Sequence, residues 1–219
     1  LDTLECIIEQ DGIQGTTVIV ADNSDQDFSK FVLTKLTKRI ASKVNFQVIK
    51  GGYPSEARRN GSMLVKTPYV LFLDADIFLR DKRLLSDIFE QKMMDKYDLL
   101  TAKISTAETH DWIFRWFDRF QKISMYLKSP FAVGSFQLWN ITTYWEVGGY
   151  NPEYIVAEDY AISKQVNPKR IGVLDTKKVW TSPRRFKKKG LWYMIKLMFS
   201  SYLNRNNPDF FKKDHDYWK

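Results

Sequence analysis

An apolar run that ends in two aspartates constrains this chain more than any other feature of its sequence. Residues 69–78 read YVLFLDADIF, so Asp74 and Asp76 directly follow a segment that belongs in a protein core. Carboxylates in such a place need a partner, because burying an unpaired charge is costly. The run therefore predicts a buried strand whose carboxyl end binds a positive charge.

Strand and helix patterns alternate through the first half of the chain. They predict helices at residues 1–8, 28–40 and 55–66, the last capped by Ser55, and strands at 16–24, 44–50 and 69–74. This alternation predicts the α/β class, with a mostly parallel sheet that helices cover on both faces. Ligands of such sheets bind beyond the carboxyl ends of the strands, so we expect Asp22 and Asp74 on one rim.

The second half of the chain continues with shorter elements. We expect helices at residues 112–127, from Glu158 onward and at 190–203, and strands at 134–140, 170–175 and 178–182. The first of these helices has an apolar stripe that should face the core, formed by Ile113, Trp116, Phe117, Phe120, Ile123 and Leu127. No internal repeat or linker interrupts the sequence, so residues 1–219 are expected to form one domain.

The charge of the chain is positive and unevenly distributed. The sequence holds 34 Lys and Arg against 26 Asp and Glu, a net charge of +8, and residues 177–196 are rich in basic side chains and contain no acid. This balance favours partners rich in phosphate, such as nucleotides, nucleic acid or an anionic membrane surface. The single cysteine, Cys6, rules out an internal disulfide and fits a reducing compartment. We expect neither a signal peptide nor a membrane-spanning helix.

Two acidic motifs at strand ends are candidates for ligand binding. Asp74 and Asp76, two residues apart in a turn, can both reach one hard divalent cation, which in turn can hold a diphosphate. The alternative is that Asp74 caps the turn while Asp76 faces water. Asp22 can accept hydrogen bonds from a base or a ribose hydroxyl, and an Asx turn is the alternative for that residue.

Three further motifs carry charge that chemistry can use. Arg58 and Arg59 lie near the start of a helix, where free N–H groups also attract anions; the alternative is a solvated helix face. The pair Glu158–Asp159 offers a carboxylate that can take a proton from an attacking hydroxyl, or it is only a charged helix start. Arg184 and Arg185 can clamp phosphate oxygens, and the lysines and aromatics that follow suit a membrane surface or a helix packed on its own domain.

Four fragments of the sequence, taken in order, resemble the GT-A glycosyltransferases of family 2. They are VIVADNSDQD, ARRNGSMLVKTPYVLFLDADI, GSFQLWNITTYWEVGGYNPEYIVAEDYAIS and VWTSPRR, and the resemblance covers nearly the whole chain. It implies a Rossmann-like α/β domain with a nucleotide-sugar-binding half at 1–105, an acceptor and catalytic half at 106–189, and a C-terminal amphipathic helix and tail at 190–219. It also implies an inverting transfer from a UDP- or GDP-sugar, assisted by Mg2+ or Mn2+.

The same resemblance implies roles for individual residues. On the donor side, Asp22 would contact the nucleobase, with Asn23 and Ser24 in the same loop, and Arg59 and Asn60 would support the donor. Asp74 would lie near the ribose or sugar, and Asp76 would bind the metal most directly. Arg184 and Arg185 would face the diphosphate. On the acceptor side, Asp159 would be the base, with Glu158 second, and Gly134, Ser135, Gly148 and Gly149 would shape the site. Carboxylates from distant parts of the chain are therefore expected to line one cleft.

Two departures from the family pattern stand out. The family begins with a strand and loop that seat the nucleotide, and no such strand precedes Leu1, so we expect a truncated or unreported first segment. Many relatives place a metal-binding histidine near the late strand, where this chain has Trp180–Ser182. His215 would replace it only if the C-terminal tail folds back; otherwise His110 and His215 are expected at the surface.

The expected function is metal-dependent sugar transfer to a hydroxyl or phosphate of a glycan or polyprenyl-linked acceptor, in surface polysaccharide or glycolipid synthesis. We expect a cytoplasmic protein, peripheral at the inner face of the membrane, with no nucleic-acid partner. Two alternatives remain open: a nucleotidyltransferase of similar fold, and a basic module that binds membranes or nucleic acid without catalysis. The second alternative makes no use of Asp74, Asp76 and Asp159.

Overall fold

The computed structural model describes residues 2–24, 42–106, 111–126, 129–176, 178–182 and 188–218. The helix expected at 28–40, His110, and the pair Arg184 and Arg185 lie outside these ranges, so they stay predictions.

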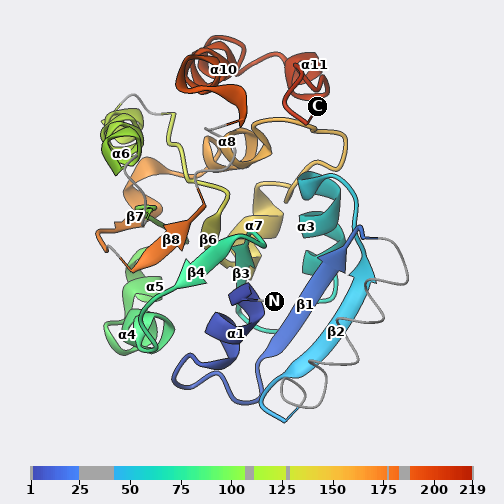
Figure 1. Cartoon of the computed structure of the whole chain (residues 1–219), viewed down its shortest axis with the longest axis vertical. Coiled ribbons are helices and arrows are strands. Elements are labelled where there is room, and N and C mark those ends of the chain that lie inside the picture. Colours follow the sequence, from blue (N-terminus) through green and yellow to red (C-terminus); the bar gives the residue numbers. More distant parts are fainter. Residues whose placement is uncertain are drawn as a thin grey trace.

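Helices and strands alternate along the described chain (Figure 1). The strands are β1 (Thr17–Asp22), β2 (Asn45–Lys50), β3 (Tyr69–Leu73), β4 (Ile77–Leu79), β5 (Leu99–Ala102), β6 (Phe136–Asn140), β7 (Ile171–Leu174) and β8 (Val179–Thr181). The helices are α1 (Asp2–Ile8), α3 (Pro54–Ser62), α4 (Leu84–Glu90), α5 (Met93–Lys96), α6 (Asp111–Tyr126), α7 (Ile141–Glu146), α8 (Glu158–Ser163), α10 (Leu191–Leu203) and α11 (Pro208–Phe211). The α/β class expected from the sequence is confirmed.

The strands pair in a more mixed way than the mostly parallel sheet expected. A four-stranded sheet has the order β3-β6-β5-β7, β1 pairs with β2 in parallel, and β4 pairs with β8 antiparallel. Within the four-stranded sheet, β6 runs antiparallel to both of its neighbours, while β5 and β7 are parallel. The reason is the long excursion through α6, after which the chain enters β6 in the opposite direction to β5.

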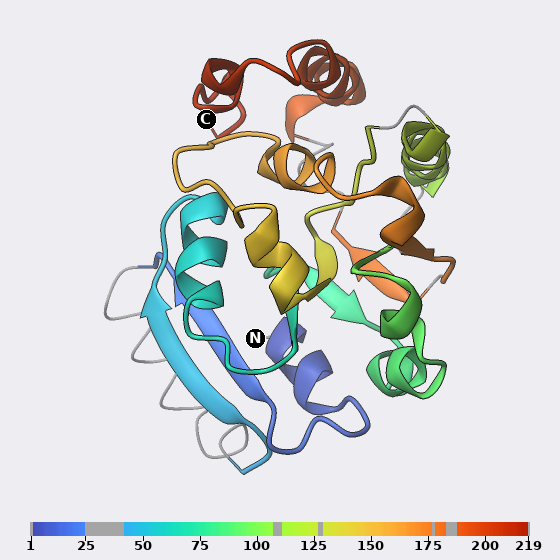
Figure 2. The same ribbon diagram turned by 180° about the vertical axis from the view of Figure 1, so that it is seen from behind.

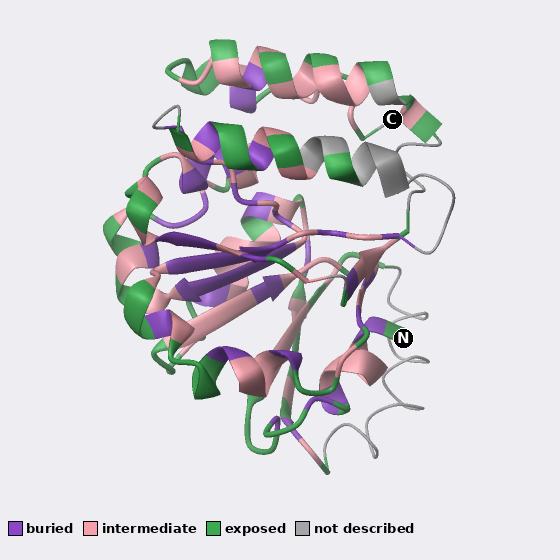
Figure 3. Ribbon diagram, turned by 90° about the vertical axis from the view of Figure 1, so that its left-hand side faces the viewer, coloured by how far each residue is buried: buried purple, intermediate pink, exposed green. Residues whose placement is uncertain are grey.

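The central sheet is buried on both faces. Successive residues of a strand point to opposite sides, so Leu99 and Leu100 of β5 belong to different apolar clusters, as do Leu138 and Trp139 of β6. These four side chains are all nearly inaccessible. Figure 3 shows these strands as the buried centre of the molecule, with helices α6 and α10 side by side above them.

Figure 2 shows helix α3 beside α7. The Ser62 hydroxyl of α3 contacts the Tyr144 hydroxyl of α7 (3.1 Å). Ser55 is not the cap that the sequence predicts: Tyr53 is the N-cap, and the buried Ser55 hydroxyl donates to the Tyr154 carbonyl instead. The Ser55 hydroxyl therefore forms a tertiary hydrogen bond and does not cap the helix.

Helix α6 differs from its predicted core-facing stripe. Ile123 is 53% exposed, whereas the neighbouring polar residues Gln121 and Ser124 are buried. The Phe120 ring packs edge-on against Phe131, with ring centroids 6.3 Å apart. Part of the buried side of this helix is therefore polar, and the expectation for Ile123 is wrong.

Candidate active site

The turn between β3 and β4 carries Asp74 and Asp76 and is held by hydrogen bonds to two other segments of the chain. The N–H of Asp74 donates to the carbonyl of Ser135, which lies just before β6 (3.3 Å). The Thr3 hydroxyl of α1 donates to the Ala75 carbonyl (2.6 Å). Both aspartates of the turn line the same cavity.

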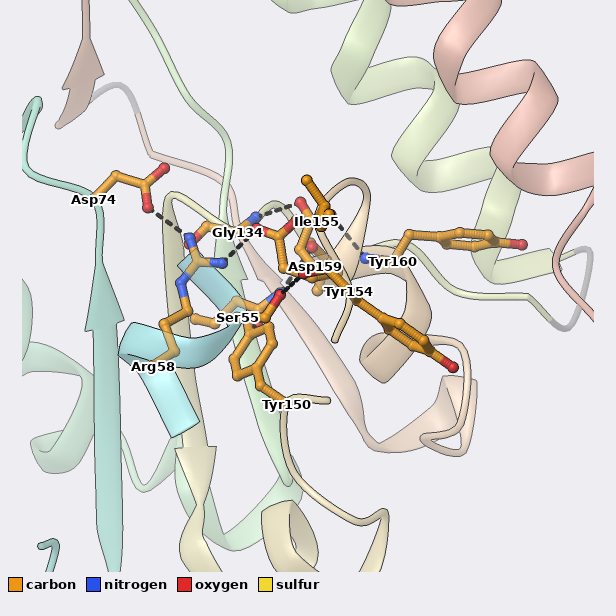
Figure 4. Close-up of polar contacts among 12 residues, drawn as sticks. Ser55, Arg58, Asp74, Gly134, Tyr150, Tyr154, Ile155, Asp159 and Tyr160 are labelled. Atoms are coloured by element: carbon orange, nitrogen blue, oxygen red, sulfur yellow. Dashed lines mark hydrogen bonds and ion pairs between the residues drawn. The ribbon is translucent and has the colours of Figure 1, made fainter. Parts of the chain in front are cut away.

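The cation beside Asp74 is Arg58, from α3. One nitrogen of its guanidinium donates to Asp74 Oδ1 (2.6 Å) and to the Gly134 carbonyl (3.3 Å), and another donates to Glu158 Oε1 (2.7 Å) (Figure 4). The guanidinium also lies 5.1 Å from the centroid of the Tyr150 ring. The side chains of Arg58 and Glu158 are only 10% and 12% exposed, so this ion pair is nearly buried.

The surroundings of Arg58 keep it charged. Burial alone would lower the pKa of Arg58, but its electrostatic interactions with Tyr150 and with the carboxyl groups of Asp74, Glu158 and Asp159 raise that pKa well above its ordinary value. The protein thus supplies its own counter-charge to the carboxylates of this region, through a residue that can bridge two of them at once.

Asp159 lies at the centre of the cluster, with both carboxylate oxygens held by backbone groups. The N–H of Gly134 donates to Oδ2 and the N–H of Tyr160 donates to Oδ1, both at 2.8 Å. Burial, helped by the charge of Glu158, raises the pKa of Asp159 to about 7, although Arg58 and the two N–H donors oppose this. A carboxylate with such a pKa can accept a proton near neutral pH.

Two backbone features place Asp159 there. Ala157, the N-cap of α8, has φ 51° and ψ 33°, a left-handed conformation that costs a non-glycine residue about 1–2 kcal/mol. It turns the chain so that the first two residues of α8 are Glu158 and Asp159. On the other side, a Cβ at Gly134 would lie 3.0 Å from Asp159 Oδ2, a close contact that would require the carboxylate to shift, so glycine suits the close approach of this backbone N–H to Asp159.

These groups line one cavity with a volume of about 200 Å³. Its polar wall consists of Arg58, Asp74, Asp76, Asp118, Gly134, Ser135, Glu158, Asp159, Thr181 and Ser182. The predicted catalytic pair and the predicted metal ligands, more than eighty residues apart in the sequence, are therefore neighbours in space.

The residues of this wall fit a divalent ion that is only partly held by protein. Asp74 and Asp76 offer hard oxygen ligands on the same cavity. Within the described ranges, no group of three or more His, Cys, Asp or Glu side chains is placed to hold a metal. An ion bound by these two aspartates would take its other ligands from water and from diphosphate oxygens, as Mg2+ commonly does.

The predicted nucleobase loop lies apart from this cavity wall. Asp22 ends β1, and its Oδ1 accepts hydrogen bonds from the N–H and the hydroxyl of Ser24 (2.9 and 2.6 Å), with Asn23 between them. The Asx turn that the sequence offered as an alternative is therefore present. Asn60 is half-buried on α3 and is not among the residues that line the cavity.

Arg59 and the paired glycines meet one another. Arg59 donates to the carbonyls of Gly148 (2.9 Å) and Tyr150 (3.1 Å). Gly148 and Gly149 both have positive φ, and they line a second cavity of about 310 Å³ that shares Glu158 with the first. Arg59, predicted on the donor side, thus braces the loop predicted on the acceptor side.

The C-terminal tail folds back on the domain but does not bring a histidine to the cavity. The His215 ring nitrogen Nε2 lies 2.8 Å from the Phe210 carbonyl, and the two rings stack 4.3 Å apart. Tyr217 lines the cavity instead. The tail folds back, as a metal-binding role for His215 would require, but His215 is not among the residues that line the cavity.

Gln121 is a site residue that the sequence does not single out, and Arg58 is one whose role the sequence does not predict. The sequence marks Arg58 and Arg59 together as a possible anion site, and the family resemblance gives the donor role to Arg59. Both arginines fall between the buried Ser55 and Ser62 on α3, so helical spacing could predict that they face inward but not what each one meets. No sequence signal marks Gln121, which lines the apolar part of the cavity.

Comparison with known proteins assigns the chain to a family. The model of glycosyl transferase family 2 matches residues 1–148, so the chain belongs to this family. No curated protein sequence matches the chain.

Solved structures share the fold. TarS from S. aureus aligns over 93% of this chain and 37% of its own, with 16% identity and a TM-score of 0.57. Residues 1–349 of TarS align over 99% and 63%, with 15% identity and a TM-score of 0.59. The mannosyltransferase PcManGT from Pyrobaculum calidifontis, solved with GDP-Man and Mn2+, aligns over 98% and 63%, with 12% identity and a TM-score of 0.63. The chain therefore spans 37–63% of the length of these relatives.

Proposed function

We propose that this protein transfers a sugar from a nucleotide-diphosphate donor to an acceptor with inversion at the anomeric carbon, and that Asp159 is the catalytic base. The observation that carries the proposal is a buried carboxylate with a pKa of about 7 on the wall of a cavity that also contains Asp74 and Asp76. An inverting transfer needs a base to take the proton of the attacking hydroxyl, whereas a retaining one needs no such group.

The chain's own residues would divide the work as follows. Asp159 accepts the proton, and its two backbone donors hold the carboxylate in one orientation. Arg58 fixes Asp74 and Glu158 and keeps their charges compensated before any ligand enters. Preorganisation of this kind lowers the cost of reorganisation during reaction.

The metal and donor assignments follow the family. Asp76, with Asp74, would hold Mg2+ or Mn2+, and the ion would offset the charge that develops on the leaving diphosphate. Asp22, Asn23 and Ser24 would contact the nucleobase, and Arg59 and Asn60 would support the donor through α3. Arg184 and Arg185 would face the diphosphate. The GDP-Man and Mn2+ named for PcManGT support a UDP- or GDP-sugar and a divalent ion here.

The test separates binding from transfer. Asp159→Asn should leave donor affinity within about twofold of the native protein and slow transfer by about 10²–10⁴-fold. Asp76→Ala should abolish the Mn2+-dependent thermal shift produced by UDP- or GDP-sugars. Asp95→Asn, an exposed acid on α5, is the matched control and should change neither. Full transfer by Asp159→Asn, or a retained anomeric configuration in the product by NMR, would refute the base assignment.

A second part of the proposal is contact with an anionic membrane surface. Among the described residues, no helix is long and apolar enough to span a bilayer. Helix α10, however, exposes Trp192 (82%), Phe199 and Leu203 on one stripe, together with Lys196. Residues 188–208 contain no acid. An exposed aromatic and basic stripe of this kind favours the headgroup region of anionic lipid.

Vesicle sedimentation tests this contact. The native protein should pellet with vesicles containing phosphatidylserine, less in high salt, and less after Trp192→Ser with Phe199→Ser. Phe89→Ser on α4, another exposed aromatic, should not matter. Equal pelleting of the native protein and the double variant would exclude α10 as the contact.

The family match disfavours the two alternative functions, a nucleotidyltransferase and a nucleic-acid-binding module.

A further inference from the structure

The active-site cavity continues past the carboxylates into an apolar half. Helices α6 and α10 wall this half, and they lie side by side beyond Tyr160 (Figures 3 and 4). Its lining includes Phe120, Phe131, Val156, Met194, Leu197 and Met198. A cavity with charged groups at one end and apolar side chains at the other suits an amphiphilic ligand, which has a polar head and an apolar body.

One polar group stands in the apolar half without a partner. Gln121 of α6 lines the cavity and is 1% exposed, and its Nε2 finds no hydrogen-bond acceptor in the part of the chain that the structure describes. Buried donors of this kind are rare, because they lose their water without gaining an acceptor. The amide therefore points to an oxygen atom that a ligand brings.

The charges of the wall restrict the head of that ligand. Among the described lining residues, the carboxylates are Asp74, Asp76, Asp118, Glu158 and Asp159, and Arg58 is the cation. The guanidinium of Arg58 already pairs with Asp74 and Glu158. A phosphate head would meet net negative charge here, whereas a neutral hydroxyl can donate to a carboxylate at no such cost.

We infer that the acceptor is a neutral amphiphile: its hydroxyl head lies at Asp159, its alkyl or aryl body lies between α6 and α10, and an oxygen where head and body join accepts a hydrogen bond from Gln121. This inference rests on the proposed function, because it assigns the second substrate of the same site. It narrows the acceptor from hydroxyl or phosphate to hydroxyl.

Calorimetric titration of the full chain with simple glycosides tests the inference without turnover. Octyl β-D-glucopyranoside, below its micelle concentration, should bind at least about tenfold more tightly than methyl β-D-glucopyranoside, because only the octyl chain buries apolar surface. Octyl phosphate should bind more weakly than the octyl glycoside. Equal affinities for the methyl and octyl glycosides, or tighter binding of octyl phosphate, would overturn the inference.

Gln121→Leu should change stability and ligand affinity in opposite directions, which a variant that is merely misfolded would not do. The change removes an unpartnered buried amide, so the melting temperature should rise, while affinity for the octyl glycoside should fall about tenfold. Leu197→Trp, which fills the apolar half, should also weaken the octyl glycoside and leave the methyl glycoside unchanged. Ile123→Gln, on the exposed side of α6, is the control and should change neither affinity.

These outcomes are independent of catalysis. If Gln121→Leu binds the octyl glycoside as well as the native protein does, the acceptor inference is wrong even where Asp159→Asn stops transfer. If the glycoside results hold but Asp159→Asn transfers normally, the inference about the cavity stands and the proposed base is wrong.

Discussion

Arg58 forms ion pairs with two carboxylates at once. Its guanidinium joins Asp74, at the end of β3, to Glu158, at the start of α8. Removing one partner of a nearly buried ion pair leaves the other charges uncompensated, and that loss exceeds the net value of the pair itself. The residue therefore contributes to folding and to the shape of the site together.

Arg58→Ala should lower the free energy of unfolding by about 3–5 kcal/mol, measured by urea denaturation at pH 7. Arg58→Lys should lose less, because it keeps the charge but cannot bridge two carboxylates in the same way. Arg83→Ala is the matched control: Arg83 pairs with Asp87 and Glu90 but is 58% exposed, so its loss should leave the free energy of unfolding nearly unchanged. Similar losses for Arg58→Ala and Arg83→Ala would contradict this account.

The raised pKa of Asp159 makes stability depend on pH in a defined direction. The folded protein binds the proton of Asp159 more tightly than the unfolded chain does, because the pKa rises from 3.8 to about 7 on folding. The free energy of unfolding contributed by this group is thus largest below pH 4 and falls as the pH rises toward 7. Above pH 7 the contribution is constant.

Asp159→Asn should remove this dependence. The stability of the variant relative to the native protein should therefore increase between pH 4 and pH 7, measured by denaturation at several pH values. The native transfer rate should fall below pH 7, where the base becomes protonated. Parallel stability curves for the two proteins across that range would show that the pKa of Asp159 is not raised.

At the scale of single elements, α8 is a short helix whose start is set by a strained residue. The left-handed Ala157 has no side-chain hydrogen bond to cap the helix, and it lines the cavity itself. Strain of this kind persists where the surrounding contacts impose it, often at functional sites. The next residues, Glu158 and Asp159, are held by Arg58 and by Gly134.

Ala157→Gly should raise the free energy of unfolding by up to about 1 kcal/mol, because glycine adopts the left-handed conformation without the steric penalty. Ala57→Gly, inside α3, is the control and should lower stability by about 1 kcal/mol, since its backbone is helical. Chemical denaturation measures both changes. A loss of stability at Ala157 as large as that at Ala57 would show that the strain is not real.

Elements with strong local patterns could be predicted from the sequence, and their partners could not. The run YVLFL becomes β3 because five apolar residues in a row suit a strand that packs against apolar clusters on both faces, where Phe72 is buried and the other four are partly buried. Helix α8 begins at Glu158 as expected. The choice between Arg58 and Arg59, by contrast, depends on where β3 and α8 lie in space. Ser55 illustrates the same limit: its place next to Pro54 suggests a cap, but the Tyr154 carbonyl, 99 residues later, takes its hydroxyl.

At the scale of the whole molecule, the end of the chain supports the loop that leads into α8. The Phe211 carbonyl accepts hydrogen bonds from the N–H groups of Ile155 (2.8 Å) and Val156 (3.3 Å). The Trp218 indole donates to the Ile155 carbonyl (2.8 Å). The described tail thus closes over the same segment that carries the proposed catalytic pair, Glu158 and Asp159, at the top of Figure 1.

Phe211→Ala should lower the free energy of unfolding by about 3–5 kcal/mol, because Phe211 is fully buried against Tyr160 and Ala161. It should also speed amide hydrogen exchange at residues 155–160, since the tail would hold that loop less firmly. Trp192→Ala, which removes a mostly exposed ring, should do neither. Unchanged exchange at 155–160 would mean that the tail does not support the loop.

The bridge made by Arg58 has a consequence for dividing the chain. Its guanidinium and one of its carboxylates come from sequence positions 100 apart, on either side of residue 105. A fragment that ends there would expose Arg58, which is nearly buried in the whole chain, and the complementary fragment would contain Glu158 without its counter-ion. Neither piece is expected to fold well by itself, whereas co-expression of the two should reconstitute the domain, with Arg58 and Glu158 as the contact that selects the correct assembly.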